Sequence, residues 1–146
     1  MDRYFQCELF LPRSREKLFQ FFSEARNLEI ITPSFLHFEI LPPVPDSIVE
    51  GTLIDYRIHL HGFPIRWRTK ITVWEPPVRF VDEQLAGPYR KWIHEHTFIE
   101  ENGGTRCLDH ITYSAPGGRW IDCLIVKPDL VKIFDFRREQ LLRLFA

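Results

Sequence analysis

Cysteine is scarce in this sequence, and the few cysteines present do not form a recognisable framework. The three of them, Cys7, Cys107 and Cys123, are odd in number and contain no Cys-x-x-Cys pair. Disulfide scaffolds and thiolate zinc sites both need paired cysteines, so this pattern argues against either class. We expect a reduced, cytoplasmic compartment in which the thiols act as small buried hydrophobic groups.

Long apolar runs are also missing. No segment approaches the ~20 consecutive apolar residues that a membrane-spanning helix needs. The N-terminal stretch MDRYFQCELFLPRS lacks the apolar core of a signal peptide. We therefore expect no integral membrane segment.

Neither sign of charge dominates the chain. It has 19 Lys and Arg against 20 Asp and Glu, a net charge of −1, which predicts no binding of nucleic acid. It also has no Gly-x-Ser-x-Gly motif and no phosphate-binding glycine loop. A hydrophobic content of 45% and a charged content of 27% are typical of a globular chain, and we expect residues 1–146 to form a single domain.

Three consecutive antiparallel strands dominate the middle of the chain. Alternating segments at Val78–Leu85, Arg90–Glu100 and Thr105–Ser114 are separated by turns at Gly87-Pro88 and Asn102-Gly103. Asn-Gly between two alternating runs is the strongest short hairpin signal, because both turn positions need positive φ.

The Asn102-Gly103 turn also fixes a register for the last two strands. With these two residues as the loop, His96 lies opposite Asp109, and Trp92 lies opposite Tyr113. Because side chains alternate along a strand, one face then collects the following residues: Trp92, His94, His96, Phe98, Cys107, Asp109, Ile111 and Tyr113. Alternation across the preceding turn adds Phe80, Asp82 and Gln84 to this face.

This predicted inward face is unusual because it mixes aromatic rings with polar side chains. Its polar members are Asp82, Gln84, His94, His96 and Asp109. Buried polar groups need hydrogen-bond partners or a ligand. The combination of an aromatic lining and a polar cluster therefore predicts a pocket.

The N-terminal part predicts a strand and two short helices. Arg3–Leu11 alternates as a strand, and Ser14 is placed to cap a helix over Arg15–Ser23. The predicted buried stripe of that helix is Leu18, Phe21 and Phe22. A second short helix is expected over Asn27–Ile31.

Three further strands are predicted before the central ones, over Phe35–Leu41, Gly51–Leu60 and Ile65–Trp74. Pairing Leu60 with Ile65 around a four-residue turn divides the side chains of the last two strands between two faces. The inward set is Tyr56, Ile58, Trp67, Thr69, Ile71 and Val73. The set expected to be solvated is Arg57, His59, Arg66, Arg68 and Lys70, with His61 in the turn.

The remainder, residues 116–146, predicts one long helical tract with a kink near Pro128. Its apolar stripe is Leu130, Phe134, Leu141 and Phe145, widened by Ile133, Phe136 and Leu144. A helix that is apolar over much of its circumference must be covered by other elements. The element order therefore predicts an α+β fold in which a curved seven-stranded antiparallel sheet wraps around this helix.

In its order of elements the chain resembles the START-like, or SRPBCC, superfamily, whose members have the helix-grip fold. This superfamily includes polyketide cyclase/dehydrase-like proteins. The segments that carry the resemblance are IRWRTKI, FVDEQLAGPYRKWIHEHTF, GGTRCLDHITYSAP and IFDFRREQL. The most specific part is the pattern Gly-Pro-Tyr-x-x-Trp-x-His-x-His-x-Phe. The resemblance implies a START-like ligand-binding domain with a hydrophobic cavity between the sheet and the C-terminal helix. It does not imply a reaction, since the superfamily includes carriers and enzymes.

We therefore expect binding or carriage of a small, largely hydrophobic molecule such as a lipid, an isoprenoid, a quinone or a polyketide-like aromatic. The expected ligand-binding residues are Tyr56, Trp67, Asp82, Gln84, Trp92, His94, His96, Phe98, Asp109, Tyr113, Phe134 and Arg137. No catalytic residue and no cofactor are predicted, and the chain is expected to be a monomer or a homodimer.

Three alternatives remain open. His94 and His96 have a spacing that can chelate a metal with Asp82 or Asp109, although we expect a structural or ligand-orienting cluster instead. A His–Asp pair would also suit a cyclase or dehydratase that uses acid–base catalysis. A basic outer face, which includes Arg57 and Arg66, would suit an interaction module.

Overall fold

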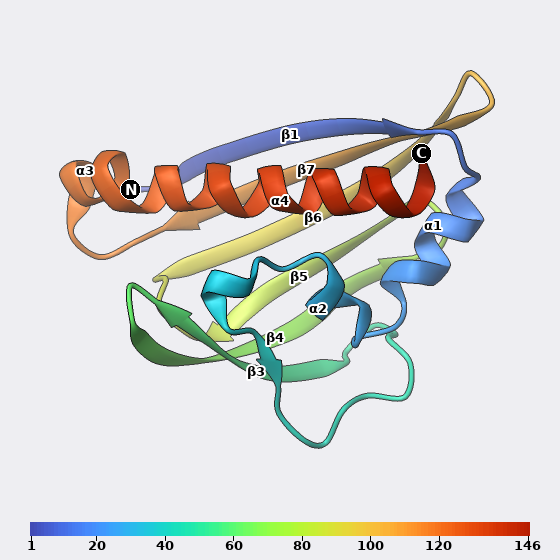
Figure 1. Ribbon diagram of the computed structural model, residues 1–146. Coiled ribbons are helices and arrows are strands. Elements are labelled where there is room, and N and C mark those ends of the chain that lie inside the picture. Colours follow the sequence, from blue (N-terminus) through green and yellow to red (C-terminus); the bar gives the residue numbers. More distant parts are fainter.

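Seven antiparallel strands form one curved sheet, and the long C-terminal helix lies across its concave face (Figure 1). The computed structural model describes all residues, 1–146. The strand order is β1-β7-β6-β5-β4-β3-β2. The predicted α+β helix-grip architecture is therefore confirmed. None of the helices is both long enough and apolar enough to cross a bilayer.

The elements have the following bounds. The strands are β1 (Arg3–Leu11), β2 (Glu39–Ile40), β3 (Leu53–Leu60), β4 (Phe63–Glu75), β5 (Arg79–Ala86), β6 (Lys91–Glu101) and β7 (Gly104–Ser114). The helices are α1 (Arg15–Phe22), α2 (Asn27–Ile30), α3 (Gly118–Ile121) and α4 (Lys127–Phe145), with a 3₁₀ turn η1 (Ser34–Leu36) and a π-helical turn η2 (Asp122–Val126).

The β6–β7 hairpin has the predicted register. Asn102 and Gly103 have φ values of 48° and 77°, the left-handed conformations that a two-residue turn requires. His96 consequently lies opposite Asp109, and Trp92 lies opposite Tyr113. Because β5 pairs with β6 through Asp82 opposite His94, the polar residues of all three strands share one face.

The β3–β4 hairpin is tighter than predicted. His61 and Gly62 have φ values of 50° and 85° and form a two-residue turn, so Leu60 pairs with Phe63 instead of Ile65. The shift is two residues, an even number, so the shift by itself moves no side chain to the other face. Tyr56 and Trp67 are both inward as predicted, and the observed register places them directly opposite each other.

A β-bulge in β4 corrects the predicted orientation of Val73. The register between β4 and β5 shifts between Ile71 and Val73, so Val73 lies opposite Val81 on the outer face and Trp74 turns inward. The ring of Trp74 packs edge-on against Phe19 with centroids 4.7 Å apart. Period-two alternation cannot anticipate an extra residue in one strand.

The N-terminal helices differ from the predictions in two places. Ser14 caps α1 as predicted by accepting a hydrogen bond from the backbone N–H of Lys17, but Phe19 is buried where Phe21 was expected. The expected strand over Phe35–Leu41 is wrong. Its first part is η1, and His37 then adopts a left-handed conformation with φ of 48°, so only two residues pair as β2.

The C-terminal tract is interrupted where a kink was predicted. The turn η2 ends directly before α4, which carries Pro128 in its first turn, where its missing N–H is tolerated. Leu130, Phe134, Leu141 and Phe145 are buried against the sheet as predicted. Leu144 is 45% exposed, and Cys123 is exposed, which corrects the expectations for both residues.

Gly104 supplies a test of this architecture, because it begins β7 directly beside the end of β1. A Cβ atom there would lie 2.5 Å from the carbonyl oxygen of Leu11 and 2.6 Å from the ring of Phe10. Gly104→Ala should therefore lower the unfolding free energy by about 2–3 kcal/mol. Gly103→Ala, which has open space but a φ of 77°, is the matched control and should cost about 1 kcal/mol. Urea unfolding gives both values, and the reverse order would contradict the described packing.

Candidate functional site

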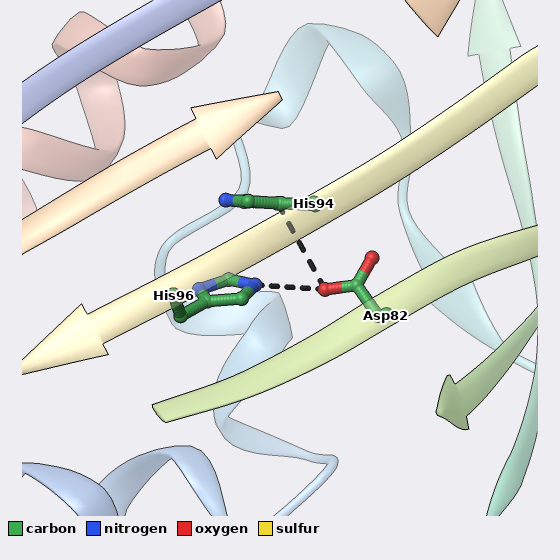
Figure 2. Close-up of side chains that lie close together, drawn as sticks. All are labelled: Asp82, His94 and His96. Atoms are coloured by element: carbon green, nitrogen blue, oxygen red, sulfur yellow. Dashed lines mark hydrogen bonds and ion pairs between the residues drawn. The ribbon is translucent and has the colours of Figure 1, made fainter. Parts of the chain in front are cut away.

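Strands β5, β6 and β7 and helix α4 bring five polar side chains together: Asp82, His94, His96, Asp109 and Arg137. We call this group the charged cluster. The rings of His94 and His96 stack with centroids 3.6 Å apart. His94 Nε2 lies 2.7 Å from Asp109 Oδ1, and His96 Nε2 lies 2.7 Å from Asp82 Oδ2. Figure 2 shows Asp82 beside the stacked histidines, with one oxygen directed toward both rings.

Arg137 of α4 determines the tautomer of His96, that is, which ring nitrogen carries the proton. Its Nη2 donates to His96 Nδ1 at 3.2 Å and to Asp109 Oδ1 at 3.3 Å. Since Nδ1 accepts this bond, the ring proton of a neutral His96 must lie on Nε2, which donates it to Asp82. Burial and the adjacent His94 lower the pKa of His96 to about 4, despite the opposing effect of Asp82. His96 is therefore neutral near pH 7.

Both carboxyl groups of the cluster are ionised. Burial favours the neutral acid, but Arg137 and the hydrogen bond from His94 outweigh it and hold the pKa of Asp109 below its usual range. Burial likewise opposes ionisation of Asp82, and His94 and His96 outweigh it and lower that pKa. The cluster thus contains two carboxylates, one guanidinium and a neutral His96.

An apolar cavity of about 170 Å³ lies between the inner sheet face and α4, next to the charged cluster. Of its 24 lining residues, 18 are hydrophobic. The charged or titratable part of its wall consists of Asp82, His94, His96 and Arg137, with two tyrosines elsewhere. The cavity therefore has one charged end and a wide apolar wall, as small-molecule sites generally have.

Four electron-rich rings form part of this wall: Tyr56, Trp67, Tyr89 and Trp92. Trp67 stacks on Tyr56 and meets Tyr89 and Trp92 edge-on, with centroid distances of 5.7, 5.5 and 5.3 Å. Its indole N–H is buried and has no hydrogen-bond partner. An unpartnered buried donor is costly unless a ligand or water satisfies it.

A second cavity, of about 240 Å³, lies on the other side of the cluster between β1, β7 and α4. His96 and Arg137 line both cavities, whereas Asp109 lines only this one. Its wall is less apolar, with 10 hydrophobic residues of 17, and includes Glu8 and Arg138. The first cavity is thus the better site for a hydrophobic ligand.

Eight of the twelve predicted binding residues line the apolar cavity: Tyr56, Trp67, Asp82, Trp92, His94, His96, Phe134 and Arg137. The other four lie elsewhere. Gln84 exchanges two hydrogen bonds with the backbone of Tyr89, Phe98 packs against Phe19, and Tyr113 donates to Asp122 at 2.6 Å. Asp109 lies behind the histidine pair.

The sequence reasoning missed several cavity residues. Tyr89 lies in the β5–β6 connection, and Leu130 and Ile133 lie on α4. Tyr89 carries a usable signal, because it precedes Trp92 in the Gly-Pro-Tyr-x-x-Trp pattern and their ring centroids are 4.8 Å apart. Gln84 holds Tyr89 in place, a relation that alternation does not reveal.

The two histidines of the β3–β4 hairpin, His59 and His61, were expected to be solvated, but each makes a contact within the protein. His61 Nε2 lies 2.8 Å from Asp129 Oδ2 at the start of α4, although its side chain is 61% exposed. His59 packs edge-on against His37 with centroids 5.1 Å apart. The His61–Asp129 contact ties the tip of this hairpin to the helix across the sheet.

Asp82, His94 and His96 offer ligand atoms that all lie within 4.8 Å of one another, a grouping that could hold a metal ion. In the structure the closest of these atoms are engaged with each other, and Arg137 places a positive charge against His96. A metal would have to displace these bonds. That the cluster is structural or ligand-orienting, and not a metal centre, stays a prediction.

The cysteines supply no nucleophile near the cavity. Burial raises the pKa of Cys7 and that of Cys107 to about 12, so both thiols are protonated near pH 7. Cys7 instead contacts Asp109 Oδ2, with Sγ at 3.7 Å. A thiol in this state is unreactive.

Comparison with known proteins establishes the fold. No protein-family model matches the sequence, and no curated protein matches it significantly. Protein CV1439 of Chromobacterium violaceum has 12% sequence identity and a TM-score of 0.75, over 98% of this chain and 97% of that one. Ginseng major latex-like protein 151 of Panax ginseng has 7% identity and a TM-score of 0.74, over 100% and 99%. Protein Ms6760 of Mycobacterium smegmatis has 15% identity and a TM-score of 0.69, over 97% and 89%.

These similarities span almost the whole length of each chain, and they show a START/SRPBCC-like fold, as the sequence resemblance indicated. At such low identity they show the fold alone. The residues of the charged cluster and the cavity must therefore carry any functional argument.

The low pKa of His96 predicts that acid lowers the stability of the fold at pH values above those at which Asp82 and Asp109 become protonated. Between pH 6.5 and about pH 4 the unfolded chain binds a proton at His96 that the folded chain does not, so stability must fall as the pH falls. We expect a loss of roughly 2–3 kcal/mol between about pH 7 and pH 4.5, or about 5–10 °C in Tm. Asp82 and Asp109 add their own loss only below their unfolded pKa of 3.8.

His96→Gln tests the assignment, because Gln keeps a donor for Asp82 but does not titrate. The variant should show a clearly flatter decline of Tm over the same pH range. A parent protein whose Tm is unchanged down to about pH 4.5, or a variant with the parental slope, would show that His96 is not held neutral.

Proposed function

We propose that residues 1–146 act as a single domain that binds or carries a small, largely hydrophobic ligand in the apolar cavity. The observation that carries this proposal is a cavity wall with 18 hydrophobic residues of 24, closed at one end by a buried charged cluster. The wall supplies affinity through burial of apolar surface, and the cluster orients the polar end of the ligand.

The size of the cavity narrows the ligand class. A cavity of roughly 150 Å³ in another protein holds benzene, so about 170 Å³ suits a molecule of one or two rings. Among the classes considered from the sequence, a compact aromatic fits this volume better than a lipid or isoprenoid chain. Burial of ~150 Å² of such a ligand provides ~4 kcal/mol, which corresponds to a Kd of about 1 mM. Tighter binding requires polar contacts with the cluster.

An acid–base enzyme of the cyclase or dehydratase type is the second candidate. It is favoured by His94, which lines the cavity and whose Nδ1, 3.8 Å from Asp82 Oδ2, makes no hydrogen bond. Against it, both nitrogens of His96 are engaged, and the low pKa of Asp82 and that of Asp109 leave neither carboxyl group protonated near pH 7. Binding without turnover is therefore the better supported function.

The interaction-module alternative is weaker. Two of the cations on the predicted basic face are paired with acids, Arg57 with Glu39 and Arg68 with Asp55. The charge available to attract a partner is correspondingly reduced. We further propose a cytoplasmic protein that is a monomer or a homodimer, in keeping with three unpaired cysteines.

Filling the cavity tests the proposed function. Ile133 is half-buried on α4 and lines the cavity. Ile133→Trp should weaken binding of indole, a neutral two-ring probe, by about tenfold or more, because the new side chain takes up the space. Lys132→Trp, the same new residue on the exposed side of the helix, should leave indole binding unchanged.

Calorimetric titration measures both affinities, and native mass spectrometry of the freshly purified protein identifies any small molecule that co-purifies. Indole binding by the parent that Ile133→Trp does not weaken would place the ligand outside this cavity. No binding of indole and no co-purified molecule would overturn the proposed function.

A further inference from the structure

The two carboxylates of the charged cluster are used unequally by the protein. Asp109 Oδ1 accepts hydrogen bonds from His94 and Arg137, and its Oδ2 accepts one from the thiol of Cys7. Asp82 uses only Oδ2, which accepts from His96. Asp82 Oδ1 accepts no hydrogen bond from the protein, and the side chain is 19% exposed and lines the apolar cavity. Asp82 therefore presents an unsatisfied anionic oxygen at the charged end of the cavity, directed away from the histidines in Figure 2.

The only guanidinium in the cavity wall, that of Arg137, is already engaged. Arg137 donates to Asp109 and His96, and its guanidinium carbon lies 5.2 Å from the ring centroid of Phe22 and 5.7 Å from that of Phe134. The cluster places two carboxylates, Asp82 and Asp109, beside this one guanidinium. An anionic ligand would add a further negative charge next to them in a site of low dielectric, where like charges repel strongly.

The aromatic wall also favours a positively charged ligand. Tyr56, Trp67, Tyr89 and Trp92 are the electron-rich rings of the cavity, and their faces attract cations. Their mutual packing, with Tyr89 and Trp92 centroids 4.8 Å apart, presents several rings to one small volume. A cation beside Asp82 would thus meet a carboxylate and aromatic rings in the same cavity.

We propose that the cavity selects a small aromatic or alicyclic amine, with the ammonium group donating to Asp82 Oδ1 and the ring packed against Trp67 and Trp92. This inference rests on the proposed function and adds the charge and the polar group of the ligand. Two buried donors without partners, Trp67 Nε1 and Arg137 Nε, fit a neutral hydroxyl, ether or carbonyl oxygen elsewhere on the molecule.

Two probes of one ring and opposite charge test the proposal: phenethylamine and 3-phenylpropionate, titrated by calorimetry at about pH 7 and low salt. Phenethylamine should bind at least about tenfold tighter, since both probes bury the same ring and differ in the sign of their charge. Asp82→Asn should reduce this ratio to about threefold or less.

Asp55→Asn is the matched control, since Asp55 lies outside the cavity wall and pairs with Arg68. It should keep the parental preference for the amine. If Asp82→Asn does not fold, the preference of the parent protein for the amine or the acid still tests the proposed charge of the ligand.

Equal binding of the two probes, or tighter binding of the acid, overturns the proposed amine preference while indole binding upholds the proposed function. An amine preference that survives in a folded Asp82→Asn variant overturns the assignment to Asp82. If no probe binds, indole included, the proposed function fails together with this inference.

Discussion

The structure depends on the pairing of two stacked, buried histidines with two ionised carboxylates and one guanidinium. Removing such ions from water costs several kcal/mol each, and only well-placed partners offset that cost. Strands β5, β6 and β7 each supply members of the charged cluster, and α4 supplies Arg137. Sheet register and helix position must therefore both be correct for the cluster to form. A shift of one residue in β6 would direct both imidazoles away from their partners.

The cluster also explains why a cavity persists beside it. An apolar sheet face packed against an apolar helix would be expected to close to native density. Here the charged side chains keep their own partners at one end, and large rigid rings such as Trp67 and Trp92 form the wall. The result is a small space that is apolar except where Asp82 and its neighbours face it. The START/SRPBCC-like fold supplies the sheet and the helix, whereas the chemistry of the site belongs to these side chains.

Local sequence patterns predicted which residues of the site share a face, but they did not predict the contacts that these residues make across the fold. The Asn102-Gly103 turn determines the pairing of β6 and β7, so the position of His96 opposite Asp109 could be predicted. The bulge that turns Trp74 inward and the hold of Gln84 on Tyr89 depend on contacts across the fold, which alternation does not encode. The sequence could place Arg137 on α4. It could not predict that Arg137 binds Asp109 and His96, which lie 28 and 41 residues earlier in the chain.

The protonation of His96 tests this account most directly, because it links the helix, the sheet and the charge of the cavity. Long-range ¹H–¹⁵N NMR correlation at about pH 7, assigned by comparison with His96→Gln, distinguishes the imidazole tautomers. We expect a neutral ring with its proton on Nε2 and an unprotonated Nδ1 that accepts from Arg137. A doubly protonated His96, or a neutral ring with the proton on Nδ1, would contradict it.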